Sequence, residues 1–211
     1  MDMKMLICNF ESLMDKEEAI TTSTMLEIDR MRKNGGLLVV TSTKELNEII
    51  DYNYSFPFID YIITYQGSLL YEVETGKVLY KNPITSEKVK ELEKDTEEKI
   101  EYNNEVYVIK TTNEEIISKI KKLNLKYISI KKDIYISETD KLDALNILCE
   151  KKNIKQNEVI SIGLDDSDMS IQKATYGISM RNSNLKIKNN SYYMTNSTYH
   201  NGVRDVIQKF F

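Results

Sequence analysis

The stretch that decides the fold lies near the end of the chain and reads Val159-Ile160-Ser161-Ile162-Gly163-Leu164-Asp165-Asp166-Ser167-Asp168. Its apolar first half is typical of a buried strand, and its acidic second half is typical of a loop. In an open parallel sheet, ligands bind beyond the carboxyl ends of the strands, because loops and helix amino termini converge there. The stretch therefore predicts a functional site at the end of this strand.

The same pattern of an apolar strand followed by a polar loop occurs twice in the amino-terminal part. Met5 to Cys8 leads into Asn9-Phe10-Glu11-Ser12, and Leu37 to Val40 leads into Thr41-Ser42-Thr43. Helical patterns separate these strands, and alternating strands and helices are the signature of a parallel sheet. We therefore predict an α/β protein with a Rossmann-like parallel sheet as its core.

The pattern of predicted helices and strands changes between Pro83 and about Asp140. A capped helix is expected from Ser86, and the segment Lys126 to Ser137 alternates polar and apolar residues like a hairpin with one solvent-exposed face. We predict that this span is a small α+β cap inserted into the main domain. The expected domains are a core formed by residues 1–82 and 141–211 and a cap formed by residues 83–140.

Composition and charge narrow the classes of partner. The formal net charge is -4, and lysines alternate with glutamates, so nucleic acid is not an expected partner. The apolar runs fall short of the roughly 20 residues that cross a bilayer, and the first residues lack the features of a secretory signal, so no membrane partner is expected. Cys8 and Cys149 form neither a metal motif nor a disulfide framework, which suits the cytoplasm, and we expect both to be buried.

The loops that follow the predicted strands carry the residues that could bind a ligand or take part in catalysis. Acidic oxygens suit Mg²⁺, which brings substrate phosphate with it, while a lysine and hydroxyl groups hold phosphate oxygens. The pattern predicts a site for phosphate plus Mg²⁺. The candidate residues are Asn9, Glu11, Thr41, Ser42, Lys141, Asp165, Asp166 and Asp168.

Each candidate also has a simpler structural interpretation. Asn9 and Glu11 fit a turn after a strand, and Thr41 with Ser42 fits a helix cap. Lys141 fits a solvated lysine in a lysine-rich chain, and the aspartates near Asp168 fit the amino terminus of a helix. His200, the single histidine, is expected at the surface.

At these residues the sequence resembles the haloacid dehalogenase (HAD) superfamily, and within it the Cof-like phosphatases, whose α/β cap lies between the second and third motifs. The first motif falls on Asn9-Phe10-Glu11-Ser12-Leu13 and the second on Val39-Val40-Thr41-Ser42. Gln66-Gly67 lies where Asn-Gly is usual, the motif lysine matches Lys141, and the fourth motif falls on Gly163 to Asp168. The order and spacing of these matches make the resemblance specific.

The resemblance assigns roles to these positions. It implies catalytic positions at Asn9, Glu11 and Lys141, phosphate binding by Thr41, Ser42 and Lys141, and metal ligands at Asn9, Glu11, Asp165 and Asp168. Family members attack phosphorus with an aspartate, and here that position is Asn9, a neutral amide that is a poor nucleophile. Leu164 replaces an aspartate that would bind Mg²⁺. If loss of the nucleophile costs on the order of 10⁴ in rate, the barrier rises by roughly 5.5 kcal/mol.

The predicted function follows from the family and from these substitutions. We expect a phosphohydrolase family member that acts on or binds small phosphorylated metabolites, with impaired hydrolysis and a weakened Mg²⁺ site, and thus the character of a pseudoenzyme. The alternative is a non-catalytic module on the same fold that binds a phosphorylated ligand or a protein. A protein-binding face would use the cap tyrosines Tyr102, Tyr107, Tyr127 and Tyr135; the sequence identifies no protein partner.

Overall fold

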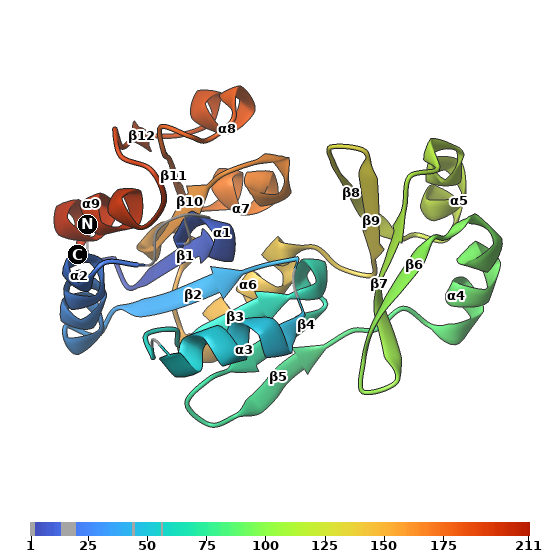
Figure 1. The fold of residues 1–211 in the computed structure, drawn as a ribbon, viewed down its shortest axis with the longest axis horizontal. Helices are drawn as coiled ribbons and strands as arrows, with labels where there is room; N and C mark the ends of the chain where they lie inside the picture. Colours follow the sequence, from blue (N-terminus) through green and yellow to red (C-terminus); the bar gives the residue numbers. More distant parts are fainter. Residues whose placement is uncertain (1–2, 14–19, 44, 56) are drawn as a thin grey trace.

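A computed structural model describes residues 3–13, 20–43, 45–55 and 57–211, and its core is one large sheet. The strand order in this sheet is β12-β11-β10-β1-β2-β3-β4-β5 (Figure 1). Six strands are parallel: β1 (Met5–Asn9), β2 (Leu37–Thr41), β3 (Tyr61–Thr64), β10 (Val159–Gly163), β11 (Tyr176–Ser179) and β12 (Tyr193–Met194). At one edge β4 (Leu69–Glu72) and β5 (Lys77–Lys81) run antiparallel. The predicted α/β fold with a Rossmann-like parallel core is confirmed.

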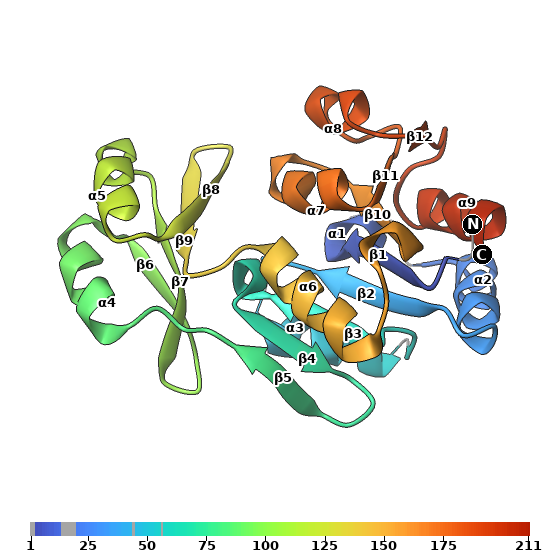
Figure 2. The same cartoon turned by 180° about the vertical axis from the view of Figure 1, so that it is seen from behind.

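Helices cover both faces of this sheet, which explains why the central strands are continuous apolar runs. One face is packed by α2 (Thr22–Lys33), α3 (Leu46–Ser55) and α9 (Tyr199–Phe210), and the other by α6 (Lys141–Lys152) and α7 (Met169–Ala174). Figure 2 shows α6 lying across the sheet on the side opposite to α3.

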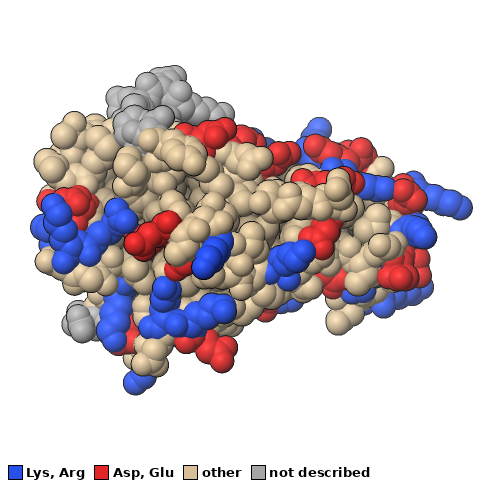
Figure 3. Space-filling view, turned by 90° about the horizontal axis from the view of Figure 1, so that it is seen from below, with Lys and Arg blue, Asp and Glu red and all other residues tan. Residues whose placement is uncertain are grey.

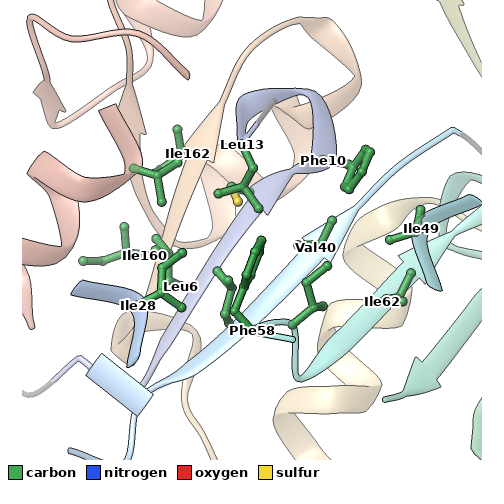
Figure 4. Close-up of a cluster of buried hydrophobic side chains, with 14 of the residues drawn as sticks. Leu6, Phe10, Leu13, Ile28, Val40, Ile49, Phe58, Ile62, Ile160 and Ile162 are labelled. Carbon is green, nitrogen blue, oxygen red and sulfur yellow. The ribbon is translucent and has the colours of Figure 1, made fainter. Parts of the chain in front are cut away.

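Successive residues of β1 enter different clusters, as the alternation of a strand requires. Leu6 packs with Ile28, Val40 and Ile160 under the first group of helices (Figure 4), whereas Ile7 belongs to the cluster under α6. Burying β1 on both faces fixes its register, so the position of the residue that ends it is fixed as well.

The cap has a second sheet, with strand order β6-β7-β9-β8. Its strands are β6 (Glu98–Tyr102), β7 (Glu105–Thr111), β8 (Lys126–Ile130) and β9 (Asp133–Ser137), and α4 (Ser86–Leu92) and α5 (Ile117–Lys122) cover its outer face. The arrowheads of β1 and β2 point toward this sheet (Figure 1). All six elements fall within the predicted insert 83–140, whose limits stay a prediction.

An aromatic cluster joins the two sheets. Tyr65, in the 3-10 turn η1 (Tyr65–Gly67) after β3, lies with its ring centroid 5.3 Å from that of Tyr107 and 6.2 Å from that of Tyr102. Tyr107 is fully buried, and Tyr102 and Tyr135 pack against the core cluster, while Tyr127 is 39% exposed. Three of the four cap tyrosines are therefore used to attach the cap to the core.

Several local expectations require correction. The predicted loop after β1 contains the short helix α1 (Phe10–Leu13), and β6 and α8 (Leu185–Asn189) were not expected. The remaining 3-10 turns are η2 (Glu93–Asp95), η3 (Glu114–Ile116), η4 (Gln156–Glu158) and η5 (Asp166–Asp168).

The expectation that His200 lies at the surface is wrong, because α9 packs against α2 and buries its ring beside Thr24. Both cysteines are buried, as expected.

Basic and acidic side chains are interspersed on the face of the molecule that Figure 3 shows. Over the described ranges many charged side chains form ion pairs, such as Lys88 with Glu138 at 2.7 Å. Among the helices of the described ranges, none has both the length and the apolar character needed to cross a bilayer.

Candidate active site

Three of the predicted site residues, Asn9, Thr41 and Asp168, meet where β1, β2 and β10 end. In the parallel register Asn9 lies opposite Thr41, and Cys8 lies opposite Ile162 at the end of β10. Asn9, Thr41 and Asp168 line one small cavity of about 10 Å³, and all three are nearly fully buried. Three loops far apart in the sequence thus deliver a neutral amide, a hydroxyl and a carboxylate to one point.

Lys141 reaches this point from the first residue of α6. Asp140 caps that helix by accepting hydrogen bonds from the backbone N–H groups of Leu142 and Asp143, so the first turn is firmly placed. The Lys141 side chain is 1% exposed, and its Nζ lies 2.9 Å from both Ser167 Oγ and Asp168 Oδ1. The solvated-lysine interpretation is therefore wrong: Lys141 forms a buried ion pair.

The loop between β10 and α7 is held from several sides. The Leu164 N–H donates to Asp168 Oδ2 at 2.9 Å, so the two carboxylate oxygens of Asp168 both have partners. The Ser183 hydroxyl donates to the carbonyl of Gly163 at 2.7 Å. Such a network fixes the loop even though its own sequence is polar.

The side chains of the three aspartates in this loop have different hydrogen-bond partners. Asp165 accepts from the Ser167 N–H at 2.8 Å and so acts as the cap of η5, as the structural alternative supposed. Asp166 turns outward, where its hydrogen bonds with Lys186 and then Asn184 lower the pKa of its carboxyl. Asp168 alone of the three carboxylates joins Lys141 in the buried site.

The first loop is arranged around Asn9. Asn9 Oδ1 accepts a hydrogen bond from the Glu11 backbone N–H at 3.3 Å, and Glu11 itself is partly exposed. Burial, followed by the charges of Asp168 and Glu11, raises the pKa of the Cys8 thiol far above its usual range. The Cys8 thiol therefore stays protonated and does not replace the missing aspartate as a nucleophile.

Thr41 and Ser42 are both buried at the end of β2. The Ser42 N–H donates to the carbonyl of Ile63, which extends the pairing of β2 with β3, and α3 begins only at Leu46. The two residues thus lie at a strand end rather than in the cap of α3.

The residues present do not fit a magnesium site as their side chains stand. Mg²⁺ prefers octahedral oxygen coordination and keeps several of its waters. Leu164 has no ligand atom, Asn9 has no charge, and both Asp168 oxygens are engaged. Across the described ranges of the chain, no cluster of three or more acidic, histidine or cysteine side chains is placed to hold a metal ion. The ligand set Asn9, Glu11, Asp165 and Asp168 stays a prediction.

A larger cavity of about 160 Å³ lies between the cap hairpin and the core, on the side of Lys141 and Ser167. Gln66 and Lys126 also line it. Gln66 is 5% exposed, has a positive φ of 56°, and its Nε2 has no hydrogen-bond partner among the described residues. Sequence reasoning gave no role to Gln66 or Ser167. The motif match at Gln66-Gly67 is the sequence signal that could have identified Gln66. For Ser167 the only sequence signal is its place between two aspartates.

The chain belongs to the haloacid dehalogenase-like hydrolase family. The sequence model of that family matches residues 11–133 and 99–207, which together span most of the chain. No curated protein matches the sequence. Enzymes of the HAD phosphatase class generally use Mg²⁺ and act on small phosphorylated substrates.

Solved structures share the fold of this chain. A haloacid dehalogenase-like hydrolase from Bacillus subtilis matches with a TM-score of 0.84 and 15% identity, over 99% of this chain and 100% of its own. The HAD phosphatase BT1666 from Bacteroides thetaiotaomicron matches with a TM-score of 0.82 and 18% identity, over 99% and 95%. The HAD subclass IIB sugar phosphatase BT4131 matches with a TM-score of 0.82 and 16% identity, over 98% of both chains. At these identities the likeness concerns the fold.

Proposed function

We propose that this chain binds small phosphorylated metabolites at Lys141, next to the ends of β1 and β2 that carry Asn9 and Thr41, and that it hydrolyses them very poorly. The observation that carries the proposal is the residue at the end of β1. A family member would need a carboxylate nucleophile there, and this chain has Asn9, with Thr41 opposite it in register. The phosphate-binding elements are kept while the attacking group is neutral.

The roles follow from the chemistry of each group. Thr41 and Ser42 supply hydroxyls, and Lys141 supplies a positive charge that would face phosphate oxygens. Glu11 keeps a carboxylate that could move a proton, with one methylene more than the aspartate of the family. An amide oxygen cannot form the acyl phosphate that an aspartate forms, so the covalent route is closed at Asn9.

The ligand class rests on the family and on the space available. One of the similar structures is described as a sugar phosphatase. In this chain a cavity of about 160 Å³ adjoins Lys141, far larger than the cavity of about 10 Å³ beside Asn9. A small metabolite fits such a space better than a polymer. We expect it to be encountered in the cytoplasm.

The alternative of a protein-interaction module has less support. It relied on four cap tyrosines, and Tyr107 is buried against the core while Tyr102 and Tyr135 pack at the same junction. Tyr127 is the most exposed of the four, and one such side chain does not make a docking surface.

A phosphatase assay tests the proposal. The natural chain is incubated with Mg²⁺ and a panel of phosphorylated metabolites beside the variant Glu11→Ala, and released phosphate is measured. We expect both proteins to give the same background rate, because no carboxylate attacks. Robust Mg²⁺-dependent turnover that disappears in Glu11→Ala would show that hydrolysis is intact and that the proposal is wrong.

A further inference from the structure

Two carboxylates of the loop after β10 are paired with lysines of the protein itself. Lys141 pairs with Asp168 at 2.9 Å, and Lys186 pairs with Asp166 at 2.7 Å. Asn9 and Leu164 contribute no charge at the two positions where the family resemblance implies aspartates. Two carboxylates fewer is the same change in formal charge as adding one divalent cation. The formal charge of this site without Mg²⁺ is therefore similar to that of a relative that has both aspartates and holds the ion. A phosphate group meets a similar formal charge in the two cases.

The space beside Asn9 agrees with this balance. The cavity lined by Asn9, Thr41 and Asp168 measures about 10 Å³, which is room for about one water molecule. Mg²⁺ keeps several waters when proteins bind it. A hydrated ion does not fit between these side chains as they are placed.

Donors for an oxyanion remain in the larger cavity. An ammonium group has three N–H donors, and Lys141 uses two of them, for Ser167 and Asp168. Within the described part of the chain, no acceptor takes the third. The Gln66 Nε2 group is likewise buried without a partner, and both residues line the same cavity of about 160 Å³. Buried donors without acceptors are costly, which indicates that a ligand oxygen completes them.

We propose that the chain binds the phosphate group of its ligand without a divalent cation, with the ammonium of Lys141 and the side-chain amide of Gln66 as donors to the phosphate oxygens. The inference rests on the proposed binding of phosphorylated metabolites and adds the way in which they are held. Ser167 contributes by fixing the direction of the Lys141 ammonium.

Isothermal titration with inorganic phosphate tests this mode of binding. The natural chain is titrated once in EDTA and once in Mg²⁺, and the two dissociation constants are compared. We expect them to agree within about threefold, a difference well under 1 kcal/mol. Binding that is tighter in Mg²⁺ by more than about threefold, or that needs Mg²⁺, would overturn this inference and leave the proposed function standing. Absence of phosphate binding in both buffers would overturn the two together.

Variants test the donors. Gln66→Met keeps the length of the side chain and removes its N–H groups, and we expect phosphate binding in EDTA to weaken roughly 10-fold or more, as for a lost hydrogen bond to a charged group. The matched control is Gln156→Met, which makes the same substitution at an exposed position that does not line the cavity and should leave phosphate binding within about threefold. If Gln66→Met unfolds at the same temperature as the natural chain and binds phosphate within about threefold of it, Gln66 is not a donor and the inference is wrong. If the Gln66→Met chain does not fold, Ser167→Ala replaces it: we expect more than about threefold weaker binding, and a smaller change would overturn the inference.

Discussion

Two ion pairs hold the same loop, and they differ in almost everything except their chemistry. Lys141 and Asp168 are 1% and 7% exposed, whereas Lys186 and Asp166 are 61% and 42% exposed. The buried pair links α6 to the end of β10 and lies beside Asn9. The exposed pair links the outer side of the loop to α8. The inner side of the loop has thus kept its charged contacts although two neighbouring positions, Asn9 and Leu164, carry no charge.

Architecture and chemistry can therefore separate within one site. Breaking a buried pair leaves an uncompensated charge in a low dielectric, so such a pair persists as long as the fold persists. The side chain at the end of β1 has a smaller structural role here, because Asn9 Oδ1 accepts a single backbone hydrogen bond, from the Glu11 N–H at 3.3 Å. The binding framework can therefore outlast hydrolysis.

The largest effect on stability is expected from Lys141→Met. This change leaves the Asp168 carboxylate buried without its cation, which costs about 3–5 kcal/mol in the free energy of unfolding. Urea denaturation measures it. The double variant Lys141→Met with Asp168→Asn restores neutrality and should recover most of the loss. Equal instability of the single and double variants would mean that charge is not what the pair contributes.

Gly67→Ala should rank next, because Gly67 supports the backbone that positions Lys141. Gly67 has a φ of +93°, and an added Cβ would lie 2.0 Å from the carbonyl oxygen of Asp140, so the start of α6 must shift. We expect a loss of about 2–4 kcal/mol from backbone strain and overpacking together. The control Gly35→Ala has a similar φ of +88° but open space around it, and should cost about 1 kcal/mol. If urea denaturation shows that the two variants lose the same free energy of unfolding, the contact with Asp140 does not contribute to the loss in Gly67→Ala.

Lys186→Met should have the smallest effect. The pair of Lys186 with Asp166 is exposed, and such pairs contribute about 0.2–1 kcal/mol. A loss close to that of Lys141→Met would remove the distinction between the two pairs.

The same exposed pair sets a pH dependence with a defined sign. The pKa of Asp166 is lowered by Lys186 and Asn184, so its contribution is present above the ordinary pKa of an aspartate and is lost as the pH falls through the lowered value. Asp166→Asn should therefore be less stable than the natural chain at neutral pH, and the gap should close in acid. A gap that stays constant down to about pH 2 would show that the charge of Asp166 is not involved.

Helix α6 illustrates what could be predicted from the sequence. Its bounds depend on local signals: Asp140 closes a capping box and Asn153 ends the helix with a positive φ of 52°. The parallel strands were predictable for a similar reason, since each is a compact apolar run bounded by polar residues.

The site was less predictable because its contacts join distant parts of the chain. Asp165, Asp166 and Asp168 look equivalent in the sequence, and they turn to a backbone N–H, to Lys186 and to Lys141. Nothing local distinguishes a lysine that will be buried from one that stays in water. His200 was misplaced for the same reason, since Thr24 of α2 lies against it only after α9 has packed.

We propose that the binding framework is intact and that hydrolysis is lost because Asn9 and Leu164 stand where the family has aspartates. The most direct measurement is the initial rate of phosphate release with Mg²⁺ from the natural chain beside the double variant Asn9→Asp with Leu164→Asp. We predict that only the variant turns over, by on the order of 10⁴-fold above the natural chain, because it regains a nucleophile and a metal ligand. Equal rates well above background in both proteins would contradict the account, because the nucleophile would then lie elsewhere.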